Sequence, residues 1–242
     1  PRPDELVALD HAAPGVNIPP AGAAPFLYYI YREEGRVFQD VGLWNTGTVS
    51  VTGTSEPEEV RTLFVTDGVL PILGVQPALG RVFTKTDDSP GSPETVVLSS
   101  GYWKTKFGGE RSAVGRMLMV DSKPREIIGV LPDSFRFLDH RVSLVVPYRF
   151  DRSKVFLGQF SYSGIARLKP GTSIDQASAD AARLIPISLT RFPPFPGGNV
   201  KMFEEARLVP RVTTLKDDLV GDVKTDDVFK LAEKYFGWIP RG

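Results

Sequence analysis

Cysteine is absent from this chain of 242 residues, and histidine occurs only twice, at His11 and His140. The missing thiols exclude disulfides, thiolate nucleophiles, iron–sulfur clusters and zinc–thiolate sites. Two histidines this far apart also exclude a metal centre built from several imidazoles, and they offer little for a Ser-His-Asp triad. We therefore expect a protein without a cofactor or a resident metal.

An excess of charge of one sign is also missing. The 29 basic and 29 acidic residues give a formal net charge of zero. A nucleic-acid-binding protein usually carries a basic patch that neutralises phosphates, so no nucleic-acid partner is expected. The sequence also lacks a continuous apolar run of the roughly 18–20 residues that a membrane helix needs, and its first residues lack the apolar segment of a signal peptide. Because it begins with Pro1, we expect an excised or processed part of a longer chain.

The common catalytic motifs are not found. The sequence contains no GxxxxGK[ST] phosphate loop, no GxSxG nucleophile elbow and no HExxH zinc motif. Asp87 and Asp88 lie in a loop rich in Ser, Pro and Gly, where a calcium site is conceivable. The spacing of an EF-hand is missing, however, and a solvated loop is the more ordinary interpretation. We expect no catalytic residue and no enzymatic activity.

Glycine and proline, at 23 and 21 residues, are spread along the chain and predict many short elements joined by turns. Hydrophobic spacing predicts helices over 25–38 and 173–185, the second with a capping box made by Ser173 and Gln176 and an end near Pro186. Strands are predicted where short apolar runs lie between turn residues, at 58–66, 95–100, 142–150 and 163–168, with a hairpin over 117–132. Residues 11–25 and 191–199 are expected to be connecting segments, and 45–47 a turn. This mixture indicates an α+β fold.

The stretch "LGVQPALGRVF" at 73–83 combines small apolar runs with glycine and proline. Gly74 is expected to end a short helix in a left-handed cap, Pro77 to fix an extended segment, and Gly80 to allow a tight turn before a strand over 81–83. A similar arrangement returns in "AVGRMLM" and "IGVLP". Local structure therefore explains the whole set of motif residues without a ligand: Gly74, Pro77, Gly80, Arg81, Phe83, Gly115, Arg116, Gly129 and Pro132.

The order of these motifs carries a resemblance. "VTDGVLPILGVQPALGRVFTKTDD", "VVLSSGYWKTKFGGERSAVGRMLMVDSKPREIIGVLP" and "GIARLKPGTSIDQASADAARL" follow one another as in the extracytoplasmic domain of MacB-like permeases of ABC transporters, which are related to FtsX-like permeases. The resemblance covers residues 40–185, and it rests on many short motifs in order rather than on any single one.

This resemblance implies a two-lobed domain on the periplasmic or extracytoplasmic face of the cell membrane, as part of an integral membrane protein. A lobe with β-α-β units would comprise 1–66 and 155–223, and a β-rich inserted lobe 67–154. The domain would be non-catalytic and would transmit ATP-driven motion to substrate efflux or extraction, while contacting a partner or substrate. The implied partners are a cytoplasmic ABC ATPase, a second permease, an adaptor or outer-membrane channel in some members, and flanking membrane helices outside this chain.

Residues 224–242, "KTDDVFKLAEKYFGWIPRG", depart from the family pattern, and no family role is assigned to them. Two other functions remain as alternatives. One is a soluble sugar- or peptide-binding module with a pocket around Trp44, Trp103 or Tyr148. The other is a hydrolase that uses Asp87 or Asp139. The aromatic residues of "RFPPFP" are interpreted first as local packing, and Phe192 and Phe195 become candidate partner contacts if they lie on the surface.

Overall fold

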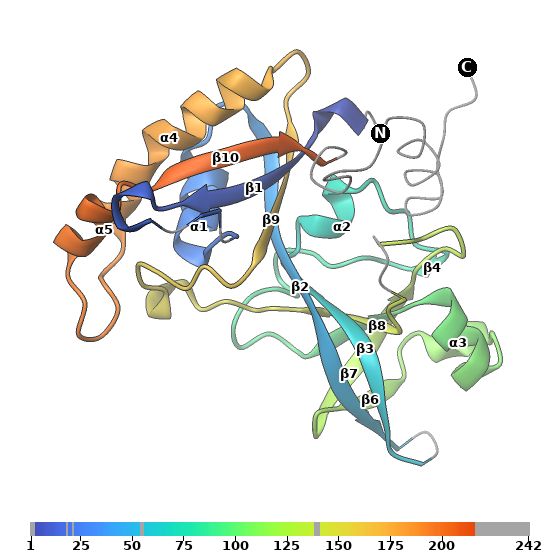
Figure 1. The fold of residues 1–242 in the computed structure, drawn as a ribbon. Helices are drawn as coiled ribbons and strands as arrows, with labels where there is room; N and C mark the ends of the chain where they lie inside the picture. The colour runs from blue at the N-terminus through green and yellow to red at the C-terminus, as the bar shows by residue number, and fades with distance from the viewer. Residues whose placement is uncertain (1–2, 18, 21, 54–55, 138–140, 216–242) are drawn as a thin grey trace. The chain divides into compact units, whose positions relative to one another are not determined.

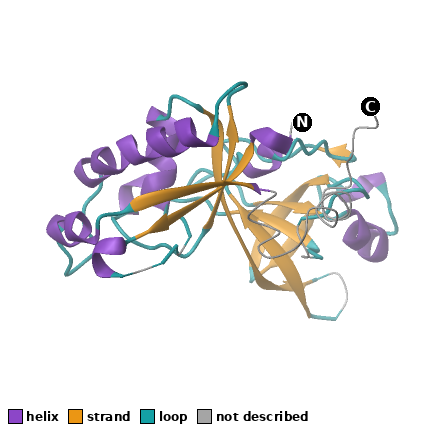
Figure 2. Cartoon of the chain, turned by 45° about the horizontal axis from the view of Figure 1, so that its top comes forward, coloured by secondary structure: helices purple, strands orange, loops and turns teal. Residues whose placement is uncertain are grey.

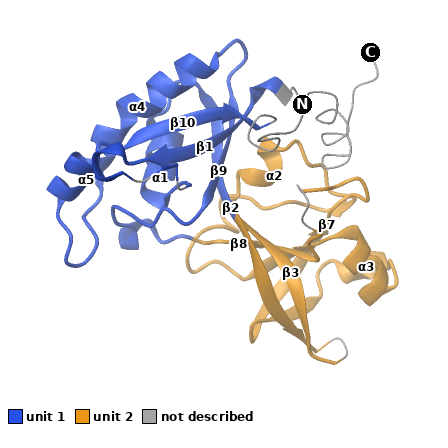
Figure 3. Ribbon diagram, viewed as in Figure 1, with its two compact units in different colours: residues 1–44, 150–218 blue, residues 45–149, 219–242 orange. Residues whose placement is uncertain are grey.

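A computed structural model describes residues 3–17, 19–20, 22–53, 56–137 and 141–215. The chain divides into two compact units, shown in Figure 3. Unit 1 comprises Pro1–Trp44 and Phe150–Asp218, and the described part of unit 2 is Asn45–Arg149. The predicted lobe boundaries were placed after residues 66 and 154, whereas the compact units divide after Trp44 and Arg149. The mixed α+β architecture predicted from the sequence is confirmed.

Unit 1 is built from two interlocked β-α-β units. Its sheet has the order β10-β1-β9-β2, and each neighbouring pair is antiparallel. The strands are β1 (Leu6–Ala12), β2 (Phe38–Thr52, its first half), β9 (Ser163–Leu168) and β10 (Val209–Thr214). The helices are η1 (Pro3–Glu5), η2 (Pro14–Val16), α1 (Pro25–Glu34), η4 (Arg152–Lys154), α4 (Ile174–Arg191) and α5 (Val200–Ala206). β1 and β2 are parallel with β9 between them, and β9 and β10 are parallel with β1 between them, so each β-α-β unit is split by a strand of the other (Figure 1).

Local sequence signals explain the helices of unit 1. Pro25 occupies the first turn of α1, where its missing N–H costs nothing, and Gly35 follows the last helical residue. The Ser173 hydroxyl accepts a hydrogen bond from the Gln176 backbone N–H, while the Gln176 side chain accepts one from the Ser173 N–H. The predicted capping box of α4 is therefore confirmed.

The predicted end of α4 at Pro186 is wrong, because the helix continues to Arg191. Pro186 removes one helical hydrogen bond, but Ile185 and Ser188 on either side of it are buried, and the Ser188 hydroxyl donates to the Ile185 carbonyl at 2.6 Å. Packing of this last part of α4 against unit 1 outweighs the local cost of the proline.

The described part of unit 2 is rich in strands, drawn in orange in Figure 2, and contains two short α-helices. Its elements are the second half of β2, β3 (Glu58–Val65), α2 (Val69–Ile72), β4 (Leu79–Gly80), β5 (Thr95–Leu98), α3 (Ser100–Phe107), η3 (Arg111–Ala113), β6 (Met117–Val120), β7 (Lys123–Val130) and β8 (Leu144–Pro147). The strand order is β2-β3-β8-β5-β7-β4, and β6 pairs with both β2 and β7. The pairings therefore close a ring of six strands, and of the described strands of unit 2 only β4 lies outside it. Val51, Leu98, Leu118, Ile127 and Leu144 contribute to the buried core of this unit.

Two sequence predictions in the strand regions are wrong. No turn interrupts residues 45–47, because β2 runs through them. The side chain of Phe64 passes so close that a Cβ on Gly47 would lie 3.1 Å from its ring, and this close approach explains the glycine. Residues 81–83 do not form a strand, since pairing of β4 with β7 stops at Gly80.

Two elements of unit 1 were not predicted at all. β1 overlaps the start of the supposed connector 11–25, and α5 begins directly after the loop 191–199. Asn199 caps α5 by accepting a hydrogen bond from the Met202 N–H at 3.1 Å, and this signal was readable in the sequence.

Candidate functional site

The first of the predicted motif residues, Gly74, closes α2. It has φ of +70°, and its N–H donates to the Pro71 carbonyl while the Val75 N–H donates to the Leu70 carbonyl. This pair of bonds is the Schellman arrangement that ends a helix at a left-handed residue. The left-handed cap expected at Gly74 is present.

Gly80 and Gly129 meet across the β4–β7 pair. A Cβ on Gly129 would lie 2.2 Å from the Arg81 carbonyl oxygen, and a Cβ on Gly80 would lie 2.2 Å from the Ile128 carbonyl oxygen. Gly80 also has φ of +68°. The two glycines belong to motifs almost fifty residues apart in the sequence. Because neither has a side chain, the backbones of β4 and β7 approach more closely here than they could with any other residue at these positions.

Arg81 and Asp87 form a bidentate ion pair beside this crossing, with distances of 2.6 and 3.0 Å. Asp87 also accepts bonds from the Thr84 N–H and hydroxyl. Burial raises the pKa of Asp87, but the bonds from Arg81 and Thr84 outweigh it and leave the pKa below its usual value. Asp88 accepts bonds from the backbone N–H groups of Asp67 and Arg149. Both carboxylates of the loop therefore hold backbone and side chains of unit 2 in place.

The remaining motif residues lie in the same unit. Phe83 is buried, and Pro77 and Pro132 are partly exposed next to β4 and β7. Gly115 has φ of +92° and donates its N–H to the Ile127 carbonyl, while the Arg116 guanidinium lies 5.3 Å from the centre of the Phe107 ring. The structure brings Gly80, Arg81 and Gly129 together and places the others in the turns and loops that join the helices and strands of unit 2.

Phe192 and Phe195 differ in exposure. Phe192 is only 5% exposed, and the Arg152 guanidinium covers its ring at 4.9 Å. Arg152 is held there by Glu33 through two hydrogen bonds of 3.0 and 2.7 Å. Phe195 is partly exposed, and its side chain lines a pocket. The condition of surface exposure is thus met by Phe195 and not by Phe192.

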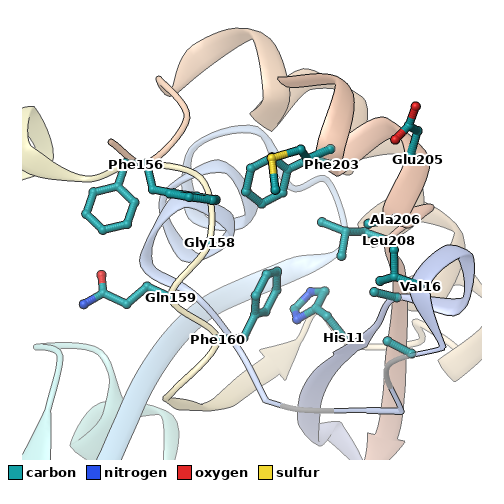
Figure 4. A pocket seen from close by; sticks show the side chains of 14 residues that line it. His11, Val16, Phe156, Gly158, Gln159, Phe160, Phe203, Glu205, Ala206 and Leu208 are labelled. Carbon is teal, nitrogen blue, oxygen red and sulfur yellow. The ribbon is translucent and has the colours of Figure 1, made fainter. Parts of the chain in front are cut away.

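This pocket is an apolar cavity of about 870 Å³ within unit 1 (Figure 4). Phenylalanine side chains come to it from three parts of the chain: Phe156, Phe160, Phe195 and Phe203. A backbone bond from the Leu157 N–H to the Pro193 carbonyl joins two of these segments. Phe195 and Phe203 pack edge to face at 6.1 Å, and Phe160 packs edge to face on the buried Phe26 at 5.7 Å. These contacts hold the rings against one another and against the core, so that they do not fill the cavity.

His11 forms the inner wall and is fully buried. Its Nδ1 lies 3.0 Å from the Gly22 carbonyl oxygen, and its Nε2 lies 2.8 Å from the Tyr31 hydroxyl. A carbonyl oxygen only accepts, so Nδ1 carries the proton and Nε2 accepts from Tyr31. Burial lowers the pKa of His11 to about 4, against the opposing hydrogen bond to Gly22. The imidazole is therefore neutral at pH 7, and both of its nitrogens are engaged.

The mouth of the pocket carries two exposed apolar side chains, Val16 at 50% and Met202 at 46%. Glu205 lies at the same edge, and its carboxylate pairs with Lys201 at 3.6 Å. η2 lies directly against α5 there, since a Cβ on Gly15 would meet the Glu205 carbonyl oxygen at 1.9 Å. The arrangement suits binding of an apolar group.

Other predicted sites are not assembled in the part of the chain that the structure describes. No group of three or more His, Asp or Glu side chains there is arranged to hold a metal ion. The pocket is not lined by Trp44, Trp103 or Tyr148, and Asp139 and His140 lie outside the described residues. Among the described helices, none is long and apolar enough to cross a membrane.

Comparison with known families decides the identity. The profile of the MacB-like periplasmic core domain matches residues 5–184, most of the chain and parts of both units. The chain belongs to this family. It is the periplasmic domain of a MacB-like ABC transporter permease, located on the extracytoplasmic face of the cell membrane.

Solved structures show the same fold for this MacB-like domain. The periplasmic region of MacB from Actinobacillus actinomycetemcomitans superposes with a TM-score of 0.62 at 13% identity, covering 91% of this chain and 94% of its own. A domain of a putative permease from Porphyromonas gingivalis gives 0.59 at 17% identity, with coverage of 89% and 92%. The extracellular domain of the noncanonic ABC-type transporter YknZ from Gram-positive bacteria gives 0.54 at 18% identity, with coverage of 74% and 91%. No curated protein matches by sequence.

Proposed function

We propose that this MacB-like domain transmits motion driven by ATP hydrolysis to substrate efflux or extraction, and that it does so without catalysing a reaction itself. The family match over residues 5–184 carries the proposal. ATP is hydrolysed by a cytoplasmic ABC ATPase, either a separate chain or another domain, which acts on this domain through the flanking membrane helices.

The two compact units are the two lobes of this machinery. Unit 1, made from both ends of the described chain, is the lobe joined to the membrane helices, and unit 2 is the inserted lobe. The close packing inside unit 2 supports the role of an inserted lobe. Its strands pair in a closed ring, and β4 and β7 cross at two glycines where there is no space for a side chain. Such a unit moves as a rigid body. The permease acts as a dimer and contacts an adaptor, an outer-membrane channel or its substrate through these lobes.

Distance measurement across the dimer tests the proposal. This chain contains no cysteine, so in a permease whose remaining cysteines have been replaced, a spin label at Met117→Cys, a position 58% exposed in unit 2, gives one label in each protomer. We expect the label-to-label distance in the full permease to change when the ATPase is trapped with vanadate. The same change should be missing with an ATPase variant that does not hydrolyse ATP. An unchanged distance in a complex that turns over ATP would contradict the transmission of motion through this domain.

A further inference from the structure

We propose that the apolar pocket of unit 1 is a binding site for an uncharged, largely apolar small molecule. The inference rests on the geometry of unit 1 alone and is independent of the transmission of motion proposed above. It assigns a ligand site to a part of the chain where the sequence indicated only local packing of aromatic residues.

The size and lining of the cavity carry the first step. Its volume of about 870 Å³ lies in the range of roughly 300–1,000 Å³ that is typical of sites for small molecules. Phe156, Phe160 and Phe195 are only partly buried, and they line a cavity whose other lining residues are mostly apolar. Water in such a cavity finds few hydrogen-bonding partners, whereas an apolar ligand removes these rings from water.

The second step concerns charge. The inner wall offers neither a charge nor an open hydrogen-bonding group at His11, whose two nitrogens are used by Gly22 and Tyr31. At the mouth, Glu205 is the one ionised side chain among the lining residues and already pairs with Lys201, and Gln159 adds only a neutral amide. A charged ligand would therefore lose its hydration for little gain, and the site favours an uncharged one.

The third step is the rigidity of the walls. Hydrogen bonding between Leu157 and Pro193, and the pairing of Ala23 with Tyr162, fix both ends of the segment that carries Phe156 and Phe160. The close contact at Gly15 fixes η2 on α5. A pocket that stays open without its ligand avoids the cost of ordering its walls when the ligand binds. Met202, unbranched and exposed at the mouth, can adapt to the ligand that enters.

Two matched probes test this inference on the whole chain. N-phenylnaphthylamine is uncharged and fluoresces in apolar surroundings, and its sulfonated analogue has the same rings with one negative charge. We expect saturable binding of one molecule of the uncharged probe per chain, with an affinity at least tenfold higher than that of the sulfonated analogue.

Variants of two exposed methionines locate the binding. Met202→Glu places a carboxylate at the mouth of the pocket, and Met117→Glu places one on unit 2 at a position of similar exposure. We expect Met202→Glu to weaken binding of the uncharged probe at least tenfold and Met117→Glu to leave it unchanged. Circular dichroism checks that both variants are folded. If Met202→Glu does not fold, Met202→Trp, which fills the mouth with an apolar ring, replaces it and should also reduce the number of probe molecules bound.

Three results would overturn the inference. They are a lack of saturable binding by the unaltered chain, equal affinity for the two probes, and equal effects of the two methionine variants. Binding of an apolar peptide at Met202 without binding of the probe would also refute it, because the pocket would then be a protein contact. None of these results bears on whether the domain belongs to a transporter, which the distance measurement addresses separately.

Discussion

Replacement of Gly129 by alanine should destabilise unit 2 far more than the added methyl group suggests. Gly129 lies in β7, and a Cβ there would lie 2.2 Å from the Arg81 carbonyl oxygen. Real Cβ atoms essentially never come closer than 3.0 Å to such an atom. The obstacle is backbone rather than the end of a flexible side chain, so β4 and β7 must move apart. Because φ of Gly129 is not in the left-handed region, this contact alone causes the effect.

The expected magnitude follows from the bonds at the crossing. The Ala78 N–H donates to the Val130 carbonyl at 2.8 Å, and the Arg81 N–H donates to the Ile128 carbonyl at 2.9 Å. Separation of the strands weakens both bonds, each worth about 1 kcal/mol, and overpacking adds about 1–3 kcal/mol. We expect Gly129→Ala to lower the free energy of unfolding by about 2–4 kcal/mol, which corresponds to a fall of roughly 5–15 °C in Tm for a chain of this size.

The matched control is Gly101→Ala. Gly101 lies in α3, and a Cβ at this position meets nothing within 4 Å. Alanine favours the helix, so this variant should gain about 0.5–1 kcal/mol. Thermal and urea unfolding followed by circular dichroism compare the two. A Gly129→Ala variant within 1 kcal/mol of the unaltered chain would refute the argument that the glycine crossing is closed to side chains.

Two further predictions concern titratable groups. Because the pKa of His11 falls from 6.5 in the unfolded chain to about 4 in the folded one, protons bind preferentially to the unfolded state between these values, and stability should fall by about 3 kcal/mol as the pH drops from 6.5 to 4. Urea titrations at several pH values check this, and an equally steep loss in His11→Gln would show that another group is responsible. Arg81→Ala should cost about 1–2 kcal/mol, because Asp87 loses its bidentate partner. The same change should raise the pKa of Asp87 and shift acid unfolding to higher pH. The control is Arg111→Ala, at an exposed arginine in η3, which should leave both the pKa of Asp87 and the midpoint of acid unfolding unchanged. Equal midpoints of acid unfolding for the two variants would contradict the role of Asp87.

Local signals in the sequence were sufficient where a few neighbouring residues determine the structure. Ser173 and Gln176 predict the capping box of α4, and Gly74 predicts the end of α2, because each signal lies within one turn of helix. The α+β class follows from the alternation of such short signals. The resemblance to MacB-like permeases was recognised from the order of many short motifs, and the family match over residues 5–184 confirms this resemblance.

The errors arise where distant residues override local preference. Gly47 was interpreted as part of a turn, but its lack of a side chain makes room for Phe64 on another strand. Pro186 was expected to end a helix that tertiary packing continues. The role of Gly80 was understood only as a turn, since nothing near it in the sequence reveals that Gly129 lies opposite.

The pocket also could not be predicted from the sequence. Its walls come from β1 and η2, the segment around Phe160, the loop at Phe195, and α5 with Leu208. Spacing along the chain carries no information on how these four segments meet. The usable signal was the repetition of phenylalanine at 156, 160, 195 and 203 near glycine and proline, which predicts aromatic packing but not a cavity.

The most direct test of the account is the side of the membrane on which this domain lies in the full-length permease. In a full-length permease whose other cysteines have been replaced, Met117→Cys, exposed on unit 2, can be labelled in intact cells by a maleimide reagent that does not cross the cytoplasmic membrane. We predict that this reagent labels the permease before lysis, as expected for a periplasmic domain. Labelling only after the membrane has been disrupted would place the domain in the cytoplasm and contradict its assignment as the extracytoplasmic part of a transporter.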